Sequence, residues 1–209
     1  MTDARTEIMA RIQAALADRP AAPVVERTYL RATEGADLDL FVERVADYRA
    51  TVEIVTPQDL PGAISAALTA HGIRSLVLPV DIPPGWLAAA AADVERLADE
   101  PPLSVHDLDT AHGVLTGAAL GIALTGTIVL DAGPAQGRRA LTLLPDHHLC
   151  VIRADQIVGT VPEALERIDP ARPQTWISGP SATSDIELNR VEGVHGPRNL
   201  HVLVVRPDS

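Results

Sequence analysis

The sequence predicts an α/β domain with a largely parallel sheet that is covered on both faces. From residue 51 onward, short β-branched runs alternate with helix-like segments, which is the pattern of consecutive βαβ units. Apolar residues make up 46% of the chain and aromatic residues only 2%, so the core must consist of Ala, Val, Leu and Ile. A length of 209 residues fits one such domain with an added arm.

The first 50 residues are predicted to form a helical arm that packs on or beside the core, which itself spans residues 51–209. Ile8 and Ile12 share one side of an amphipathic helix that ends near Pro20. A second helix is expected over residues 40–50. Packing on the chain's own domain is the interpretation adopted for the arm, and docking on a partner is the alternative.

The order of elements within the domain follows from the alternation of apolar runs and breakers. The Gly-rich run over 112–133 indicates two or three close strands broken at Gly117, Gly121 and Gly126, because glycine in a strand pattern often marks a bulge. The other predicted elements are strands at 51–55, 75–79, 175–179 and 200–205, a strand pair within 149–159, and helices at 57–70, 83–92 and 161–168.

Composition excludes several classes of function. All 17 basic residues are Arg, so neither Schiff-base lysine chemistry nor the lysine of a phosphate-binding P-loop is available. A net charge of -11 argues against general binding of nucleic acid or anionic membranes. The single cysteine, Cys150, can neither form an internal disulfide nor hold an iron–sulfur cluster. Without a signal-peptide pattern or an apolar run long enough to span a membrane, a cytoplasmic location is expected.

The segment "SGPSATSDIE", residues 178–187, concentrates hydroxyl and carboxylate side chains after an apolar strand. Ser184 and Glu187 have the spacing of a capping box, which accounts for them without any ligand. Ser181, Thr183 and Asp185 remain for an anion-binding helix start. A serine nucleophile is disfavoured, because Thr183 stands where the nucleophile elbow G-x-S-x-G requires its last glycine.

Two further loops and one arginine pair are candidates for the same pocket. "GVHGP", residues 193–197, has His195 between glycines and could supply a donor or a general acid–base. "LTGTIVLD", residues 124–131, offers hydroxyls and a glycine backbone, or is simply a bulged strand. Arg138 and Arg139 form the chain's only adjacent arginine pair and are the natural anion-binding candidates. No metal site is predicted, because neighbouring His147 and His148 would point to opposite faces of a strand.

The segments "GIALTGTIVL", "RRALTLLPDHHLCVI" and "SGPSATSDIELNRVEGVHGPRNLHVLVV", in this order, resemble the LUD-domain family, and within it the lactate-utilisation C component. The resemblance covers roughly residues 50–206. It implies a three-layer α/β sandwich with a mainly parallel sheet, similar to ribose-phosphate isomerase, glucosamine-phosphate deaminase and CoA transferases. It also implies a cluster-free subunit that supports oxidation of L-lactate to pyruvate, with iron–sulfur clusters only in its partner components.

The resemblance also indicates site residues, although no established catalytic role transfers with them. Many relatives carry an acidic residue before the TGT motif, where this chain has Leu124, and this favours binding or assembly over independent catalysis. The catalytic residues are therefore left open, with Asp185 and His195 as candidates. The predicted ligand-binding residues, for a small carboxylate or phosphate, are Thr125, Gly126, Thr127, Arg139, Ser181, Thr183, Asp185, His195 and Gly196.

Three functions stay open at this point. The first is an accessory subunit of a lactate-oxidising complex, which binds no cofactor itself. The second is a stand-alone isomerase- or transferase-type enzyme that binds a sugar phosphate or a CoA-like ligand. The third is an α/β domain whose role is oligomerisation alone.

Overall fold

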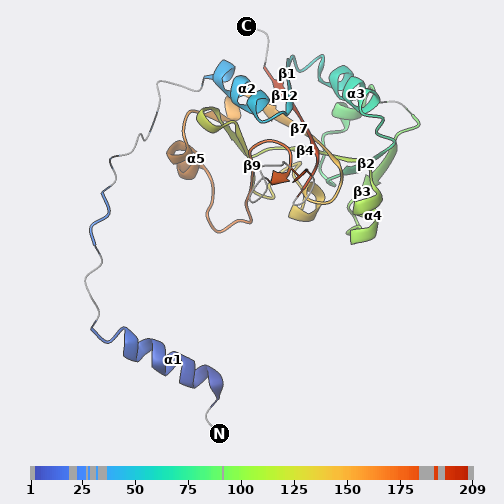
Figure 1. Cartoon of the computed structure of the whole chain (residues 1–209). Helices are drawn as coiled ribbons and strands as arrows, with labels where there is room; N and C mark the ends of the chain where they lie inside the picture. The colour runs from blue at the N-terminus through green and yellow to red at the C-terminus, as the bar shows by residue number, and fades with distance from the viewer. Residues whose placement is uncertain are drawn as a thin grey trace.

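The computed structural model describes residues 3–18, 23–26, 28, 32, 37–90, 92–183, 191–192 and 196–206. Its centre is a six-stranded sheet in the order β1-β12-β7-β4-β2-β3 (Figure 1). All five strand pairs are parallel, which confirms the predicted fold class. The strands are β1 (Thr51–Val55), β2 (Ser75–Leu78), β3 (Glu95–Ala98), β4 (Gly113–Gly117), β7 (His147–Arg153) and β12 (Asn199–Val205).

A second, four-stranded sheet has the order β8-β5-β6-β9. Its strands are β5 (Leu120–Ile122), β6 (Thr127–Leu130), β8 (Ile157–Val158) and β9 (Thr175–Ile177). The predicted strands of the Gly-rich run exist, but only β4 belongs to the main sheet, and Gly121 lies inside β5 rather than at a break. Both strands predicted within 149–159 exist, but the predicted pairing is wrong, because β7 and β8 belong to different sheets.

Three layers result because both faces of the central sheet are apolar. Leu149 and Val151 of β7 pack with helix α3 (Leu60–Ala70) and the 3-10 turn η1 (Pro84–Leu87). Cys150 and Ile152, which alternate with them, pack with helix α2 (Leu38–Asp47) and with side chains of the second sheet. Successive side chains of a strand point to opposite faces of the sheet. Neighbouring residues of β7 therefore belong to two separate core clusters.

Two shorter helices complete the packing at the edges. Helix α4 (Val105–Thr110) buries Leu108 beside β2 and β4, together with Leu141 of the 3-10 turn η3 (Arg139–Thr142). Helix α5 (Val161–Arg167) packs Ala164 onto the second sheet. Within the described residues, no helix is long and apolar enough to cross a membrane.

The two helices of the predicted arm differ in their packing. Helix α2 buries Phe41 and Val45 completely. Helix α1 (Ala4–Ala15) buries no residue, and Figure 1 shows it well away from the sheets. Ile8 and Ile12 are therefore about half exposed. Packing of the arm as a whole stays a prediction, and α2 is the part of it that contacts the domain in this structure.

Several element boundaries differ from the sequence-based expectation. Helix α3 starts at Leu60 instead of residue 57, because the Thr56 hydroxyl donates to the Asp59 carboxylate at 2.7 Å and closes a turn first. In place of the helix expected over 83–92 the structure has the short turn η1, whose Leu87 packs in the core. The short elements β3 and α4 were not predicted, because each has too few residues to show a period.

Candidate functional site

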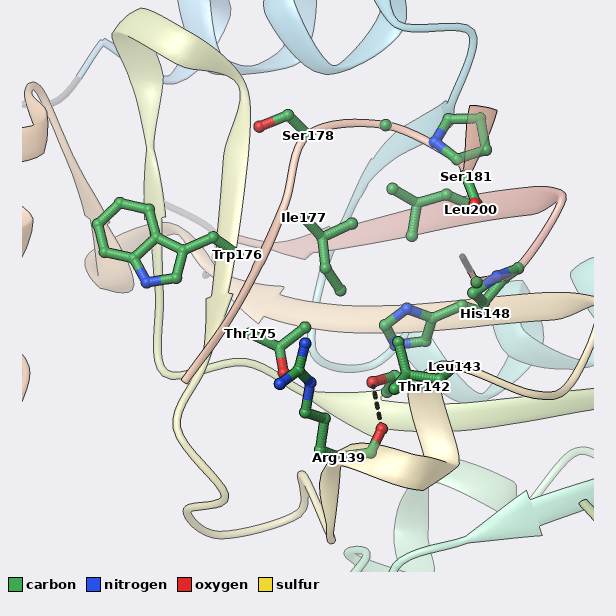
Figure 2. Close-up of a pocket in the computed structure, with 14 residues that line it drawn as sticks. Arg139, Thr142, Leu143, His148, Thr175, Trp176, Ile177, Ser178, Ser181 and Leu200 are labelled. Atoms are coloured by element: carbon green, nitrogen blue, oxygen red, sulfur yellow. Dashed lines mark hydrogen bonds between the residues drawn. The ribbon is translucent and has the colours of Figure 1, made fainter. Parts of the chain in front are cut away.

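A cavity of about 300 Å³ opens where the loop after β9 passes the first residues of β7 and β12 (Figure 2). Strand β9 pairs antiparallel with β6. The GPSAT loop therefore follows a strand of the second sheet. The cavity is lined by Arg139, Thr142, Leu143, His148, Thr175, Trp176, Ile177, Ser178, Gly179, Pro180, Ser181, Gly196, Pro197 and Leu200.

The structure brings the GPSAT and GVHGP loops together on one side of this cavity. The Ser181 amide donates to the Pro197 carbonyl oxygen at 2.8 Å, and the two-residue strands β10 (Ala182–Thr183) and β11 (Val191–Glu192) pair antiparallel just beyond. Ser181 and Gly196 consequently line the same cavity. The predicted residues Ser184, Asp185, Glu187 and His195 lie outside the described residues, as does the side chain of Thr183.

The TGT segment reaches the cavity through a chain of hydroxyl groups. The hydroxyl oxygens of Thr125 and Thr127 are 2.7 Å apart, and that of Thr127 lies 2.8 Å from the hydroxyl oxygen of Ser178. Ser178 lines the cavity, whereas Thr127 is buried behind it. Thr127 therefore contacts a lining residue, Ser178, without lining the cavity itself, and its ligand-binding role stays a prediction.

Thr125 and Leu124 face a different place. Together with Arg44, Asp47 and Tyr48 of the α2 region, they line a separate hollow of about 380 Å³. Leu124 is 47% exposed there. Leu124 therefore lies outside the 300 Å³ cavity.

Gly126 is required for packing. Its φ of +58° is left-handed, and a Cβ added to it would lie 2.6 Å from the carbonyl carbon of Arg44 in α2. Gly179, with a φ of +80°, packs in the same way against Tyr48, the residue after α2. The glycines of two predicted ligand loops thus hold the loops against α2, since any side chain would push the helix away.

The adjacent arginines have separate roles. Arg138 donates to both carboxylate oxygens of Asp99 at 2.7 and 2.9 Å and to the Leu103 carbonyl oxygen at 2.7 Å. Burial alone would raise the pKa of Asp99, but hydrogen bonds from Arg138 and from the Leu103 amide hold it below its usual value. Arg138 therefore fixes the loop to the sheet edge. The side chain of Arg139 is exposed, and its guanidinium has no hydrogen-bond or ion-pair partner among the described residues. In Figure 2 the guanidinium lies beside Thr175.

His148 forms part of the inner wall. It is 1% exposed, and its Nε2 lies 2.7 Å from the Thr116 hydroxyl oxygen. Burial lowers the pKa of His148 to about 4, so its ring is neutral near pH 7. His147 lies on the opposite face of β7, with its ring 5.1 Å from that of His71. The two histidines point to opposite faces, as alternation along a strand predicts.

Sequence reasoning did not identify Thr142, His148, Trp176 and Ser178 as lining residues. Thr142, His148 and Ser178 lie within the segments that carry the family resemblance, yet each of the four reaches the cavity because its strand or turn passes there. Ser178 alone carried a signal, since it precedes the Gly-Pro of the loop. The described lining residues include hydroxyls, one exposed guanidinium and no carboxylate, a combination that suits a small anion.

Comparison with known proteins places these features in a family. Residues 104–205 match the LUD domain. "Lactate utilization protein C" of Deinococcus radiodurans is 52% identical over 172 residues, which is 80% of this chain and 79% of that protein. The protein of the same name from Bacillus pumilus is 30% identical, over 71% of this chain and 70% of its own length.

A solved structure agrees with these sequence relatives. The crystal structure of a DUF162 family protein from Deinococcus radiodurans superimposes with a TM-score of 0.69 at 46% sequence identity. The match covers 81% of this chain and 96% of that one. The parallel sheet, the loops around the cavity and these relatives lead to one conclusion: the chain belongs to the LUD-domain family.

Proposed function

We propose that this chain is the cluster-free component of a lactate-utilisation system, and that its 300 Å³ cavity binds a small carboxylate such as lactate or pyruvate. The role in lactate utilisation is supported by the relatives called Lactate utilization protein C. The observation that carries the binding proposal is Arg139, an exposed guanidinium without a described partner at the rim of a hydroxyl-lined cavity. A guanidinium presents two parallel N–H donors that match the two oxygens of a carboxylate.

The proposed division of labour follows from the chemistry of the reaction. Oxidation of L-lactate to pyruvate releases two electrons and two protons, and these electrons need an acceptor. Cys150 is the chain's single cysteine, it is fully buried, and burial raises the pKa of its thiol to about 12. An iron–sulfur cluster needs several thiolates. The proposal therefore assigns electron transfer to cysteine-rich partner proteins and ligand binding to this chain.

His148 supports binding over proton transfer at the described part of the cavity. A general acid–base works best when its pKa lies near the working pH, whereas the pKa of His148 is about 4. The Nε2 atom of the neutral ring is already hydrogen-bonded to the Thr116 hydroxyl. We therefore assign His148 to the wall of the cavity.

The binding proposal is tested by calorimetric titration of L-lactate and pyruvate into the purified full-length protein. Arg139→Gln removes the charge and is expected to weaken binding about tenfold or more, because hydrogen bonds to charged groups are worth roughly 1.5–3 kcal/mol. Arg74→Gln is the matched control, since Arg74 is an exposed arginine outside the cavity. Equal affinity of the Arg139→Gln and Arg74→Gln proteins would refute the assigned role of Arg139.

The subunit proposal is tested in the source organism. A strain lacking this chain should fail to grow on L-lactate and recover with the wild-type gene, and the tagged protein should co-purify with iron–sulfur proteins. Lactate turnover by the purified chain alone, without any partner, would overturn the assignment as an accessory subunit. So would normal growth of the deletion strain on lactate as sole carbon source.

A further inference from the structure

A second cavity, of about 510 Å³, lies beyond the carboxyl ends of β4 and β7. It shares no lining residue with the first cavity, which takes its β7 residue, His148, from near the other end of the strand. In open parallel sheets, ligands bind outside the carboxyl ends of the strands. All of its lining residues are described by the structure: Pro83, Trp86, Gly117, Ala118, Ala119, Leu120, Asp131, Pro134, Ala135, Gln136, Val151, Arg153, Asp155, Gln156, Arg167, Ile168 and Arg172.

Three arginines from three different segments line this cavity. Arg172 is paired with Asp131 at 2.9 Å, and Arg153 with Asp155 at 2.9 Å. Arg167, in the last turn of α5, is exposed, and its guanidinium has no hydrogen-bond or ion-pair partner among the described residues. Three guanidiniums against two carboxylates leave the cavity with a net positive charge. This charge is unexpected on a chain with a net charge of -11, and it favours anions.

The loop that forms one wall is held in an uncommon conformation. Ala132 and Ala135 have φ angles of +55° and +59°, a region that costs non-glycine residues free energy. Two side chains keep the loop in place: the oxygen of the buried Gln136 side chain accepts from the Asp131 amide at 2.6 Å, and the Asp81 carboxylate accepts from the Ala135 amide at 2.8 Å. Such over-determined strain is typical of functional sites.

The remaining wall is apolar and partly aromatic. Trp86 comes from the η1 turn and Pro83 directly precedes it, while Leu120 belongs to the second sheet and Ile168 directly follows α5. The volume is within the range of cavities that hold cofactor-sized ligands, and it exceeds that of the first cavity. The side of the cavity at Arg167 thus attracts an anionic group, and the side at Trp86 suits a flat apolar group.

We propose that this second cavity binds a phosphorylated organic ligand of mononucleotide size, with the phosphate at Arg167 and Arg172 and the flat apolar part against Trp86. Arginine recognises phosphate through paired N–H donors. Arg172 is oriented by Asp131, and Arg167 supplies charge that no described carboxylate neutralises. The proposal is independent of lactate binding, because it concerns different residues at the other end of β7.

The two tryptophans of the chain allow each cavity to be observed separately. The sequence contains two tryptophans; Trp176 lines the first cavity and Trp86 the second. In full-length Trp176→Phe protein the emission reports on the second cavity, and in Trp86→Phe protein it reports on the first. AMP is titrated into both proteins, with adenosine and inorganic phosphate as partial ligands, and calorimetry of the same variants detects binding that leaves the emission unchanged.

AMP is expected to change the emission of the Trp176→Phe protein saturably, whereas adenosine and inorganic phosphate should each bind at least tenfold more weakly. Adding Arg167→Gln should raise the Kd for AMP about tenfold or more, while Arg74→Gln should leave it unchanged. Equal affinity for adenosine would refute phosphate recognition, and equal affinity for inorganic phosphate would refute the apolar contact. No saturable AMP binding by either method, or an unchanged Kd in the Arg167→Gln protein, would overturn the proposal.

Discussion

The close approach of Gly126 to helix α2 gives a prediction whose magnitude can be worked from the structure. Gly126→Ala adds a Cβ that would lie 2.6 Å from the Arg44 carbonyl carbon, at a φ of +58°. The left-handed conformation costs alanine about 1 kcal/mol or more. The overlap has to be relieved by moving backbone, since two of the three nearest atoms belong to the main chain of Arg44. Overpacking of this kind costs about 1–3 kcal/mol.

The expected loss is therefore about 2–5 kcal/mol in the free energy of unfolding. For a domain of this size, each kcal/mol lowers Tm by roughly 2–4 °C, so the Tm of the Gly126→Ala protein should fall by about 4–20 °C. Thermal unfolding followed by circular dichroism measures it, and urea unfolding gives the free energy.

Gly62→Ala is the matched control for this substitution. Gly62 is exposed in helix α3, and a Cβ added there would meet nothing within 4 Å. Alanine is the better helix former, so this variant should be as stable as the wild type or more stable by up to about 1 kcal/mol. If Gly126→Ala unfolds within a degree of Gly62→Ala, the glycine is not needed for packing against α2.

Three further experiments test the roles of His148, Asp99 and Cys150. Because the pKa of His148 is lowered to about 4 in the folded protein, its contribution to stability is complete above pH 6.5 and is lost as the pH falls from 6.5 towards 4. The loss in the free energy of unfolding should reach about 2 kcal/mol at pH 5. Urea unfolding at pH 7.5 and at pH 5 measures this loss. The same pH dependence in a His148→Gln protein would show that His148 is not its cause. Asp99→Asn breaks the charge-assisted contact with Arg138 and should lower the free energy of unfolding by about 1–2 kcal/mol, and a variant as stable as wild type would show that the contact contributes nothing. Cys150, buried with a pKa of about 12, should resist iodoacetamide in the folded protein and react in urea; mass spectrometry detects the adduct, and rapid labelling without denaturant would show that the thiol is accessible.

The sequence predicted most of the central sheet because burial on both faces leaves a clear pattern. Strands β7 and β12 contain the apolar runs LCVI and VLVV, as expected for parallel strands covered on both sides. The pattern could not assign strands to sheets. Strands β7 and β8 are neighbours in sequence, yet the turn at Ala154 sends them to different sheets, because strand pairing depends on partners distant in sequence.

The candidate site was predictable only where motifs carried it. Arg139, Ser181 and Gly196 line the first cavity, as the clustering of polar loops indicated. Thr125 and Gly126 do not line it. The sequence could not show this, because the same residue type occurs whether its side chain or backbone faces a ligand or a helix. In the same way, the sequence could not distinguish Arg138 from Arg139 as an anion-binding residue. The structure distinguishes them, because Asp99 binds the guanidinium of Arg138 and leaves that of Arg139 for a ligand.

By itself, the sequence determined the fold class, the family and the exclusion of lysine and multi-cysteine chemistry, because these depend on composition and on local pattern. The tertiary structure alone decided that His148 and Ser178 share a cavity with Arg139. It also decided that Arg153, Arg167 and Arg172 surround a second one. These groups come from segments far apart in the chain, and only the packing of two sheets against one another brings them within reach of a single ligand.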